Sequence, residues 1–197
     1  FYSKNKQFYP EHFLLGEEGY GDSVLNKSDT IWIIDPIDGT MNFVHQKRTF
    51  AISLAVFHEG VGEIGFVYDV MANQLYFAQH GKAATLNGAI IQSNLDSQSL
   101  NNGLLFGDIH RPTLFTSGYA KVIETIATFR FKGSAALEVV DVARGHGAAY
   151  VFPGINIWDI AAALIILQSM GGTWYFDNTI QGIPLQNEKS ILLACDN

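Results

Sequence analysis

The chain has 197 residues, of which 48% are apolar, and this is enough to bury a hydrophobic core in one domain or in two closely packed lobes. A formal charge of −7 argues against a nucleic-acid surface, which would carry clustered Lys and Arg, and no apolar run approaches the length of a membrane span. The single cysteine, Cys195, excludes an internal disulfide and fits a reducing compartment. We therefore expect a cytoplasmic protein without a membrane or nucleic-acid partner.

Short runs rich in β-branched and aromatic residues alternate along the chain with helical patterns. This alternation predicts an α/β architecture, an α+β layered sandwich. Tight turns are predicted at Glu59-Gly60 and Asn87-Gly88. The predicted strands cover residues 31–34, 50–57, 61–68, 74–78, 103–109, 147–152, 173–176 and 190–194.

Three segments predict helices. Ser134 is a suitable N-cap for a helix over residues 135–144. The strongly apolar residues 158–170 predict a buried helix that ends at a Gly-Gly pair, and residues 119–128 predict a third helix. No repeat or linker interrupts the pattern, so we expect a single domain over residues 1–197. Its two lobes would cover roughly residues 1–110 and 111–197.

The most informative segment is Trp-Ile-Ile-Asp-Pro-Ile-Asp-Gly-Thr, residues 32–40, in which an apolar strand leads to two carboxylates, Asp35 and Asp38. Two acids three residues apart repel each other unless a cation lies between them. Gly39 and Thr40 then begin a helix, whose first N–H groups favour an anion. A metal beside an anion is the arrangement that phosphoryl chemistry needs, so the segment predicts a metal-dependent phosphatase. The alternative is a capped turn in which Asp38 accepts helix N–H groups.

Three further acids are candidates for the same site. Glu17 and Glu18 follow an apolar pair and a glycine at a predicted loop, and Asp159 lies at the start of the apolar helix. Each has an ordinary explanation, because loop acids are usually solvated and an acid in the first turn complements the helix dipole.

Four segments together resemble signature segments of the inositol monophosphatase family, in the family's order and spacing. They are Gly-Glu-Glu at 16–18, residues 32–43, Gly-Ser-Ala-Ala at 133–136 and Trp-Asp-Ile-Ala-Ala at 158–162. The resemblance covers nearly all of the chain from about residue 11 onward. It implies an inositol monophosphatase-like domain with the alternating helix and sheet layers shared with fructose-1,6-bisphosphatase. It also implies that the family's N-terminal helices precede Phe1 and that its last helix follows Asn197.

The resemblance implies a site for two Mg²⁺ ions, or for three with a looser ion near Glu17. Glu17 and Asp35 would share one ion with the backbone carbonyl of Ile37. Asp35, Asp38 and Asp159 would hold the second ion. Carboxylates and carbonyls are the hard oxygen ligands that Mg²⁺ takes.

The resemblance also implies catalytic and substrate-binding residues. Glu17 and the Thr40 hydroxyl would orient a metal-bound water as the nucleophile, and Asp38 belongs to the same catalytic group. The N–H groups of Gly39 and Thr40 would hold phosphate oxygens. The second metal would stabilise the leaving oxygen, so no covalent enzyme intermediate is required. The implied substrate-binding residues are Asp38, Gly39, Thr40, Gly133, Ser134, Ala135 and Asp159.

Phe152 departs from the family pattern. In inositol-specific members a Glu lies seven residues before the aspartate of the Trp-Asp pair and contacts ring hydroxyls, whereas this chain has Phe152 there. An apolar ring cannot accept hydrogen bonds from a polyol, so Phe152 predicts a preference for another substrate, such as the nucleotide 2′-phosphate of NADP. The equally weighted alternative is that Phe152 is a core or dimer-contact residue.

The function expected from the sequence is a Mg²⁺-dependent phosphomonoesterase that hydrolyses a small phosphate monoester such as inositol-1-phosphate. Alternatives on the same site are NADP 2′-phosphatase, fructose-1,6-bisphosphatase and 3′-phosphoadenosine phosphate phosphatase activity. A protein-binding role in a transcription complex, as in some bacterial relatives, is the alternative from another class. The resemblance further implies a homodimer and sensitivity to Li⁺.

Overall fold

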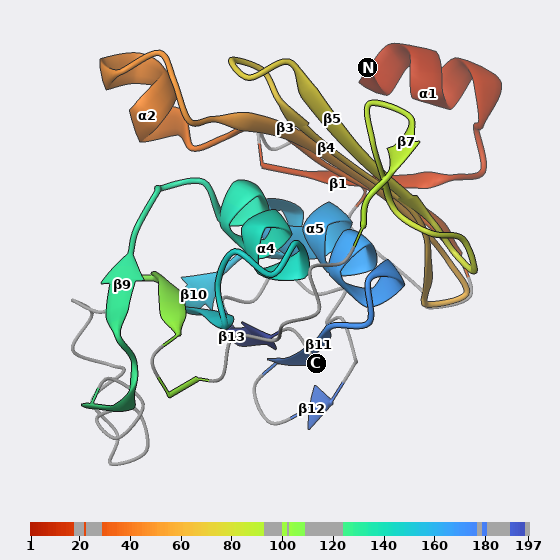
Figure 1. Cartoon of the computed structure of the whole chain (residues 1–197). Coiled ribbons are helices and arrows are strands. Elements are labelled where there is room, and N and C mark those ends of the chain that lie inside the picture. The colour runs from red at the N-terminus through yellow and green to blue at the C-terminus, as the bar shows by residue number, and fades with distance from the viewer. Residues whose placement is uncertain are drawn as a thin grey trace.

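The computed structural model describes residues 1–17, 22, 29–92, 100–101, 103–108, 124–176, 179–180 and 190–195. Two β-sheets enclose a central layer of two helices, α4 (Ala135–Ala143) and α5 (Ile157–Ser169) (Figure 1). Both helices contact strands of both sheets as well as each other. The layered α/β architecture predicted from the sequence is therefore confirmed. Among the described residues, no helix is long and apolar enough to cross a membrane.

The first sheet is built from the N-terminal part of the chain and has the order β1-β2-β3-β4-β5-β6-β7. β1 runs parallel to β2, and the remaining neighbours are antiparallel. Both predicted tight turns are present, with positive φ at Glu59, Gly60, Asn87 and Gly88, as two-residue hairpins require. The strands are β1 (Phe13–Gly16), β2 (Thr30–Asp38), β3 (Ala51–His58), β4 (Val61–Asp69), β5 (Gln74–Gln79), β6 (Thr85–Leu86) and β7 (Ala89–Ile90).

The second sheet has the order β12-β11-β13-β10-β8-β9. Its strand β10 pairs in parallel with β8 on one side and antiparallel with β13 on the other. The strands are β8 (Leu104–Gly107), β9 (Thr128–Arg130), β10 (Ala149–Ile155), β11 (Thr173–Phe176), β12 (Thr179–Ile180) and β13 (Ser190–Cys195).

The central helix α5 is buried along almost its whole length, because sheets cover it on two sides. Its run of Ala161, Ala162 and Ala163 lets the first sheet approach closely. A Cβ atom added at Gly65 of β4 would lie 2.6 Å from the carbonyl oxygen of Ala162. Two shorter helices, α1 (Tyr2–Phe8) and α2 (Thr40–His45), lie outside this central layer (Figure 1).

The predicted strands are present with small shifts at their ends, and two predictions need correction. β2 does not stop at residue 34 but continues to Asp38, so Asp35 and Asp38 lie in the strand and not after it. In the helix predicted over residues 119–128, Glu124 and Thr125 are helical, but the prediction is wrong at its end, because Thr128 begins strand β9. Residues 119–123 of that helix, and Ile109 of the predicted strand 103–109, lie outside the described residues.

Candidate active site

The predicted site residues come together at one cavity of about 320 Å³. It lies where the end of β2, the start of α2, the start of α4, strand β10 and the start of α5 meet. Ile37 is not part of the lining, although its backbone groups bond to two residues that are. The predicted residues that line the cavity are Glu17, Asp35, Asp38, Gly39, Thr40, Gly133, Ser134, Ala135 and Asp159.

A bulge in β2 brings Asp35 and Asp38 into the same cavity. In a regular strand, residues three apart point to opposite faces. Here the pairing with β3 shifts between Asp35 and Asp38, and such a bulge re-aims side chains. The backbone N–H of Ile37 donates to Asp35 Oδ1 at 2.9 Å, and the Thr40 hydroxyl donates to the Ile37 carbonyl at 3.1 Å. These two bonds fix the bulge and the entry to α2.

Asp38 is bound to the N-terminus of α4, a helix far away in the sequence. Its Oδ2 accepts the Ser134 hydroxyl at 2.5 Å and the Ala136 N–H at 2.9 Å, and its Oδ1 accepts the Ala135 N–H at 3.2 Å. The side chain is 6% exposed. Ser134 does occupy the predicted N-cap position, but its hydroxyl donates to Asp38 instead of capping its own helix. Asp38 therefore supplies the acceptor that the first N–H groups of α4 need.

The two loops that carry these contacts touch each other. Gly39 has a φ of +94° and Gly133 a φ of +76°, both in the left-handed region that glycine adopts without strain. A Cβ atom added at Gly39 would lie 3.0 Å from the Gly133 carbonyl oxygen. A side chain at position 39 would therefore push apart the starts of α2 and α4.

Burial and repulsion from neighbouring acids raise the pKa of both strand carboxylates. Burial, together with the charges of Asp38, Glu17 and Asp159, raises the pKa of Asp35 to about 8. Burial also raises the pKa of Asp38 to about 7, although the bonds from Ser134 and α4 lower it. A cation placed among these acids would favour their ionised forms.

The other two predicted acids that line the cavity, Glu17 and Asp159, approach it from different elements. Asp159 lies in the first turn of α5, where its Oδ2 accepts the backbone N–H of Asn156 at 3.0 Å. Glu17 is exposed and directly follows β1. Asp159 thus caps its helix, as its ordinary explanation predicts, and also lines the cavity. Glu18 lies outside the described residues.

The donor set fits Mg²⁺. Within the described part of the chain, no three acidic, His or Cys side chains converge as a ready-made ligand cluster. Mg²⁺ does not require one, because it is usually held by one or two carboxylates together with retained waters and substrate phosphate. The carboxylates of Glu17, Asp35, Asp38 and Asp159 all line the cavity, and the raised pKa of Asp35 and Asp38 suits such a cation.

Comparison with known proteins identifies the family. The model of the inositol monophosphatase family matches residues 1–188. The chain belongs to this family. It is 39% identical over 188 residues to the inositol-1-monophosphatase of Bacillus subtilis, and this alignment covers 93% of this chain and 69% of the relative. It is 35% identical over 171 residues to the Nus factor SuhB of Escherichia coli K12, and this alignment covers 85% of this chain and 64% of SuhB.

Solved structures of family members share the fold. Inositol monophosphatase-II from Staphylococcus aureus superposes with a TM-score of 0.86 at 35% identity, covering 98% of this chain and 75% of that one. An IMPase/NADP phosphatase complexed with Mg²⁺ and phosphate gives a TM-score of 0.85 at 25% identity, covering 98% and 72%. Hydrolysis of phosphate monoesters is the activity that membership of the inositol monophosphatase family supports.

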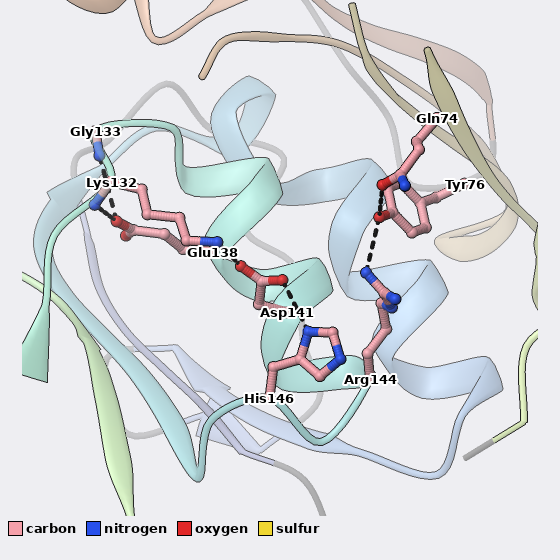
Figure 2. Close-up of polar contacts among 8 residues, drawn as sticks. All are labelled: Gln74, Tyr76, Lys132, Gly133, Glu138, Asp141, Arg144 and His146. Atoms are coloured by element: carbon pink, nitrogen blue, oxygen red, sulfur yellow. Dashed lines mark hydrogen bonds and ion pairs between the residues drawn. The ribbon is translucent and has the colours of Figure 1, made fainter. Parts of the chain in front are cut away.

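Several cavity residues were not predicted from the sequence, and two of them organise the loop before α4. Asn42 Nδ2 donates to the carbonyls of Thr49 at 2.9 Å and Lys132 at 2.7 Å, and so ties α2 to this loop. Glu138 accepts the backbone N–H groups of Lys132 and Gly133 from within α4 (Figure 2). The available signal for Glu138 was an acid inside a mostly apolar helical run, which it shares with Asp141.

Glu138 is 1% exposed, and burial raises its pKa to about 7. One turn further along α4, Asp141 pairs with the Lys132 ammonium and lies 3.3 Å from His146 Nδ1 (Figure 2). The loop is therefore attached to α4 through both the backbone and the side chain of Lys132.

A larger cavity of about 520 Å³ lies beside α4 and is lined by residues of β5, α4 and the Lys132 loop. Arg144 donates to the Tyr76 hydroxyl at 3.0 Å, with its guanidinium 5.6 Å from the centre of the Tyr76 ring. The Tyr76 hydroxyl donates to Gln74 at 2.7 Å (Figure 2). These contacts join α4 to the first sheet and have a structural role.

Proposed function

We propose that the protein is a Mg²⁺-dependent phosphomonoesterase that hydrolyses a small phosphate monoester such as inositol-1-phosphate. The observation that carries the proposal is that the carboxylates of Glu17, Asp35, Asp38 and Asp159 line one cavity, with burial raising the pKa of Asp35 and Asp38. Such a group is unfavourable for anionic substrate on its own and becomes favourable when divalent cations neutralise it. Family membership and the Mg²⁺-bound structural relative support this interpretation.

The proposed metal ligands are the residues implied by the family resemblance. Glu17, Asp35 and the carbonyl of Ile37 would hold one Mg²⁺, and Asp35, Asp38 and Asp159 a second. Bound there, Mg²⁺ would lower the pKa of a water molecule and neutralise charge on the departing oxygen.

The chain's own groups would orient the reactants. Glu17 and the Thr40 hydroxyl would direct the attacking water, and the N–H groups of Gly39 and Thr40 would hold the phosphate oxygens. Ser134 keeps Asp38 in one orientation through its hydrogen bond. Gly133 and Ala135, with Ser134, would contact the substrate beside Asp38 and Asp159.

Other substrates on the same site are the first alternative. NADP 2′-phosphatase activity is favoured by the likeness to an IMPase/NADP phosphatase, and fructose-1,6-bisphosphatase activity by the relative from Thermotoga maritima whose name combines both activities. A transcription-complex role is the second alternative, supported by the similarity to SuhB, a Nus factor. The presence of every expected acid favours the enzyme. A homodimer, a third Mg²⁺ near Glu17 and a cytoplasmic location remain part of the proposal.

The test measures phosphate released from inositol-1-phosphate, NADP, fructose-1,6-bisphosphate and adenosine 3′,5′-bisphosphate, with Mg²⁺ and with EDTA. We expect Mg²⁺-dependent release that Li⁺ inhibits and that Asp38→Asn abolishes. Glu11→Gln removes an exposed acid away from the cavity and serves as the matched control. If none of the substrates releases phosphate, the enzymatic proposal fails and the binding role takes first place.

A further inference from the structure

The larger cavity beside α4, of about 520 Å³, carries positive charge that the candidate active site lacks. Arg48, Lys132 and Arg144 line it, whereas the described residues that line the cavity of the metal-binding carboxylates include no Lys or Arg. In a chain with a formal charge of −7, three cations around one cavity are a marked local reversal of charge. A cavity of this volume can enclose a small metabolite.

Two acids also line this cavity, Asp69 and Asp141, but both are bonded to groups of the chain itself. Asp141 pairs with the Lys132 ammonium and lies 3.3 Å from His146 Nδ1 (Figure 2). Asp69 Oδ1 accepts the N–H of Ala72 at 3.0 Å, in the turn that follows β4. Lys132 is therefore neutralised by a direct partner, and the cations of the cavity that remain to be explained are the two arginines.

Neither arginine of this cavity forms an ion pair with a carboxylate in the part of the chain that the structure describes. Arg144 donates to the Tyr76 hydroxyl at 3.0 Å, and its guanidinium lies 5.6 Å from the centre of the Tyr76 ring (Figure 2). Arg48 Nε donates to Gln46 Oε1 at 3.3 Å. A guanidinium has five N–H donors in a fixed fork, so these neutral partners orient both arginines and leave further donors for an anion.

We propose that this cavity binds a small metabolite through a phosphate or carboxylate group held by Arg48 and Arg144, and that this ligand is an effector of the active site. Both groups present several oxygens to a guanidinium fork, which binds them through charge-assisted hydrogen bonds. The side chains of Thr49 and Gln74, which also line the cavity, would bond to hydroxyls of the same ligand. A cation is disfavoured there, because the two arginines would repel it. The effector role rests on the proposed phosphatase function, whereas the binding site does not.

A series of hydrogen bonds connects this cavity to the active site. Gln46, the acceptor for Arg48, donates from Nε2 to Asn42 Oδ1 at 3.2 Å. Asn42 lines the cavity of the metal-binding carboxylates and donates to the Lys132 carbonyl at 2.7 Å. Phe131, the residue before Lys132, lines both cavities. An anion on Arg48 would hold Gln46 and Asn42 in place, and with them the loop before α4, so we expect the occupied protein to bind its substrate more tightly.

The first test measures anion binding to the metal-free protein, in which the uncompensated carboxylates of the active site repel anions. Succinate and methylphosphonate represent the carboxylate and phosphate sources, and the NMR signals of the arginine Nε–H groups follow each titration at constant ionic strength. We expect at least one probe to bind saturably to the wild-type protein. Its Kd should rise about 10- to 150-fold in Arg48→Gln, the change that loss of one hydrogen bond to a charged group gives.

Arg48 is exposed, so its substitution tests the site without removing a buried contact. Arg130→Gln, at an exposed arginine of β9 outside the lining of the cavity, is the matched control and should bind the probes as the wild type does. The absence of saturable binding of both probes would overturn the inference, and so would an unchanged Kd in Arg48→Gln.

The second test measures the KM for inositol-1-phosphate with each probe at a constant concentration of free Mg²⁺. The bound probe should lower the KM about 5-fold or more in the wild type and in Arg130→Gln, but not in Arg48→Gln. A probe that competes at the active site would instead raise the KM in all three proteins. Binding without an Arg48-dependent fall in KM would overturn the effector role. If the protein hydrolyses no phosphate ester, the proposed phosphatase function fails, and the titration of the metal-free protein still decides whether the second site exists.

Discussion

Asp38→Asn is expected to stabilise the metal-free protein while it removes activity. Burial raises the pKa of Asp38 from 3.8 to about 7. A carboxyl whose folded pKa is raised favours folding at low pH, and this contribution is lost as the pH rises through the folded value. Relative to an unshifted carboxyl, ionised Asp38 lowers the free energy of unfolding by about 4 kcal/mol at pH 8, but by only about 2 kcal/mol at pH 5.

The amide of the variant cannot ionise, so it avoids this cost at both pH values. It retains one oxygen for Ser134 and Ala136, and loses the bond from Ala135, a loss that is the same at both pH values. The stability difference between variant and wild type should therefore be about 2–3 kcal/mol more favourable to the variant at pH 8 than at pH 5.

Urea unfolding in EDTA at pH 5, 6, 7 and 8 measures this difference directly. Glu11→Gln, which removes an exposed acid, controls for the change in net charge. An Asp38→Asn difference that stays constant within about 0.5 kcal/mol across this range would refute the assignment of Asp38 as a buried carboxylate under electrostatic strain.

Three further outcomes follow from the geometry. Ser134→Ala removes a hydrogen bond to the buried Asp38 carboxylate and should lower the free energy of unfolding by about 1.5–3 kcal/mol at pH 8. A decrease of less than about 0.5 kcal/mol would contradict that bond. Gly107→Ala places a Cβ 1.8 Å from the Val151 carbonyl oxygen at a φ of +124°, so unfolding should become easier by about 3–5 kcal/mol. Gly81→Ala, at a φ of +71° in open space, should cost only about 1–2 kcal/mol, and equal effects of the two alanines would contradict the close contact. Mg²⁺ should raise the Tm more at pH 8 than at pH 6. Because the pKa of Asp35 is about 8, protons compete with the metal for this carboxylate, and Mg²⁺ binding should weaken about tenfold for each pH unit below 8. A Tm increase that is independent of pH would argue against a metal site at Asp35.

The elements that the sequence predicts well are those whose pattern is local. Residues 173–176 form β11 with the predicted bounds, and the uniformly apolar α5 is buried between two sheets. β1 was not predicted, because its four residues become a strand only through parallel pairing with β2. β9 likewise depends on parallel pairing with β8, and this distant contact overrides the helical pattern that ends at Thr128.

The site was predictable in composition but not in its internal bonds. The Asp-Pro-Ile-Asp segment indicated adjacent acids beside a helix start, and the family resemblance gave the candidate acids Glu17 and Asp159 roles as metal ligands. The sequence also suggested that Asp38 accepts helix N–H groups, and it does, but from α4 and not from the helix that follows it. A local pattern cannot specify a partner almost a hundred residues away, and the roles of these residues in catalysis stay predictions.

The bond between Asp38 and α4 has a consequence for how the protein acquires activity during synthesis. The donors to Asp38 lie 96 to 98 positions further along the chain, so they emerge from the ribosome well after the strand that carries the acid. Until the later segment folds and docks, Asp38 lacks these donors and the cavity lacks the wall formed by α4, β10 and α5. Closing so long a loop is a late event compared with forming the local hairpins of the first sheet. Under the proposed function, turnover would report completed assembly, and a nascent chain that has formed only its first sheet would be catalytically silent.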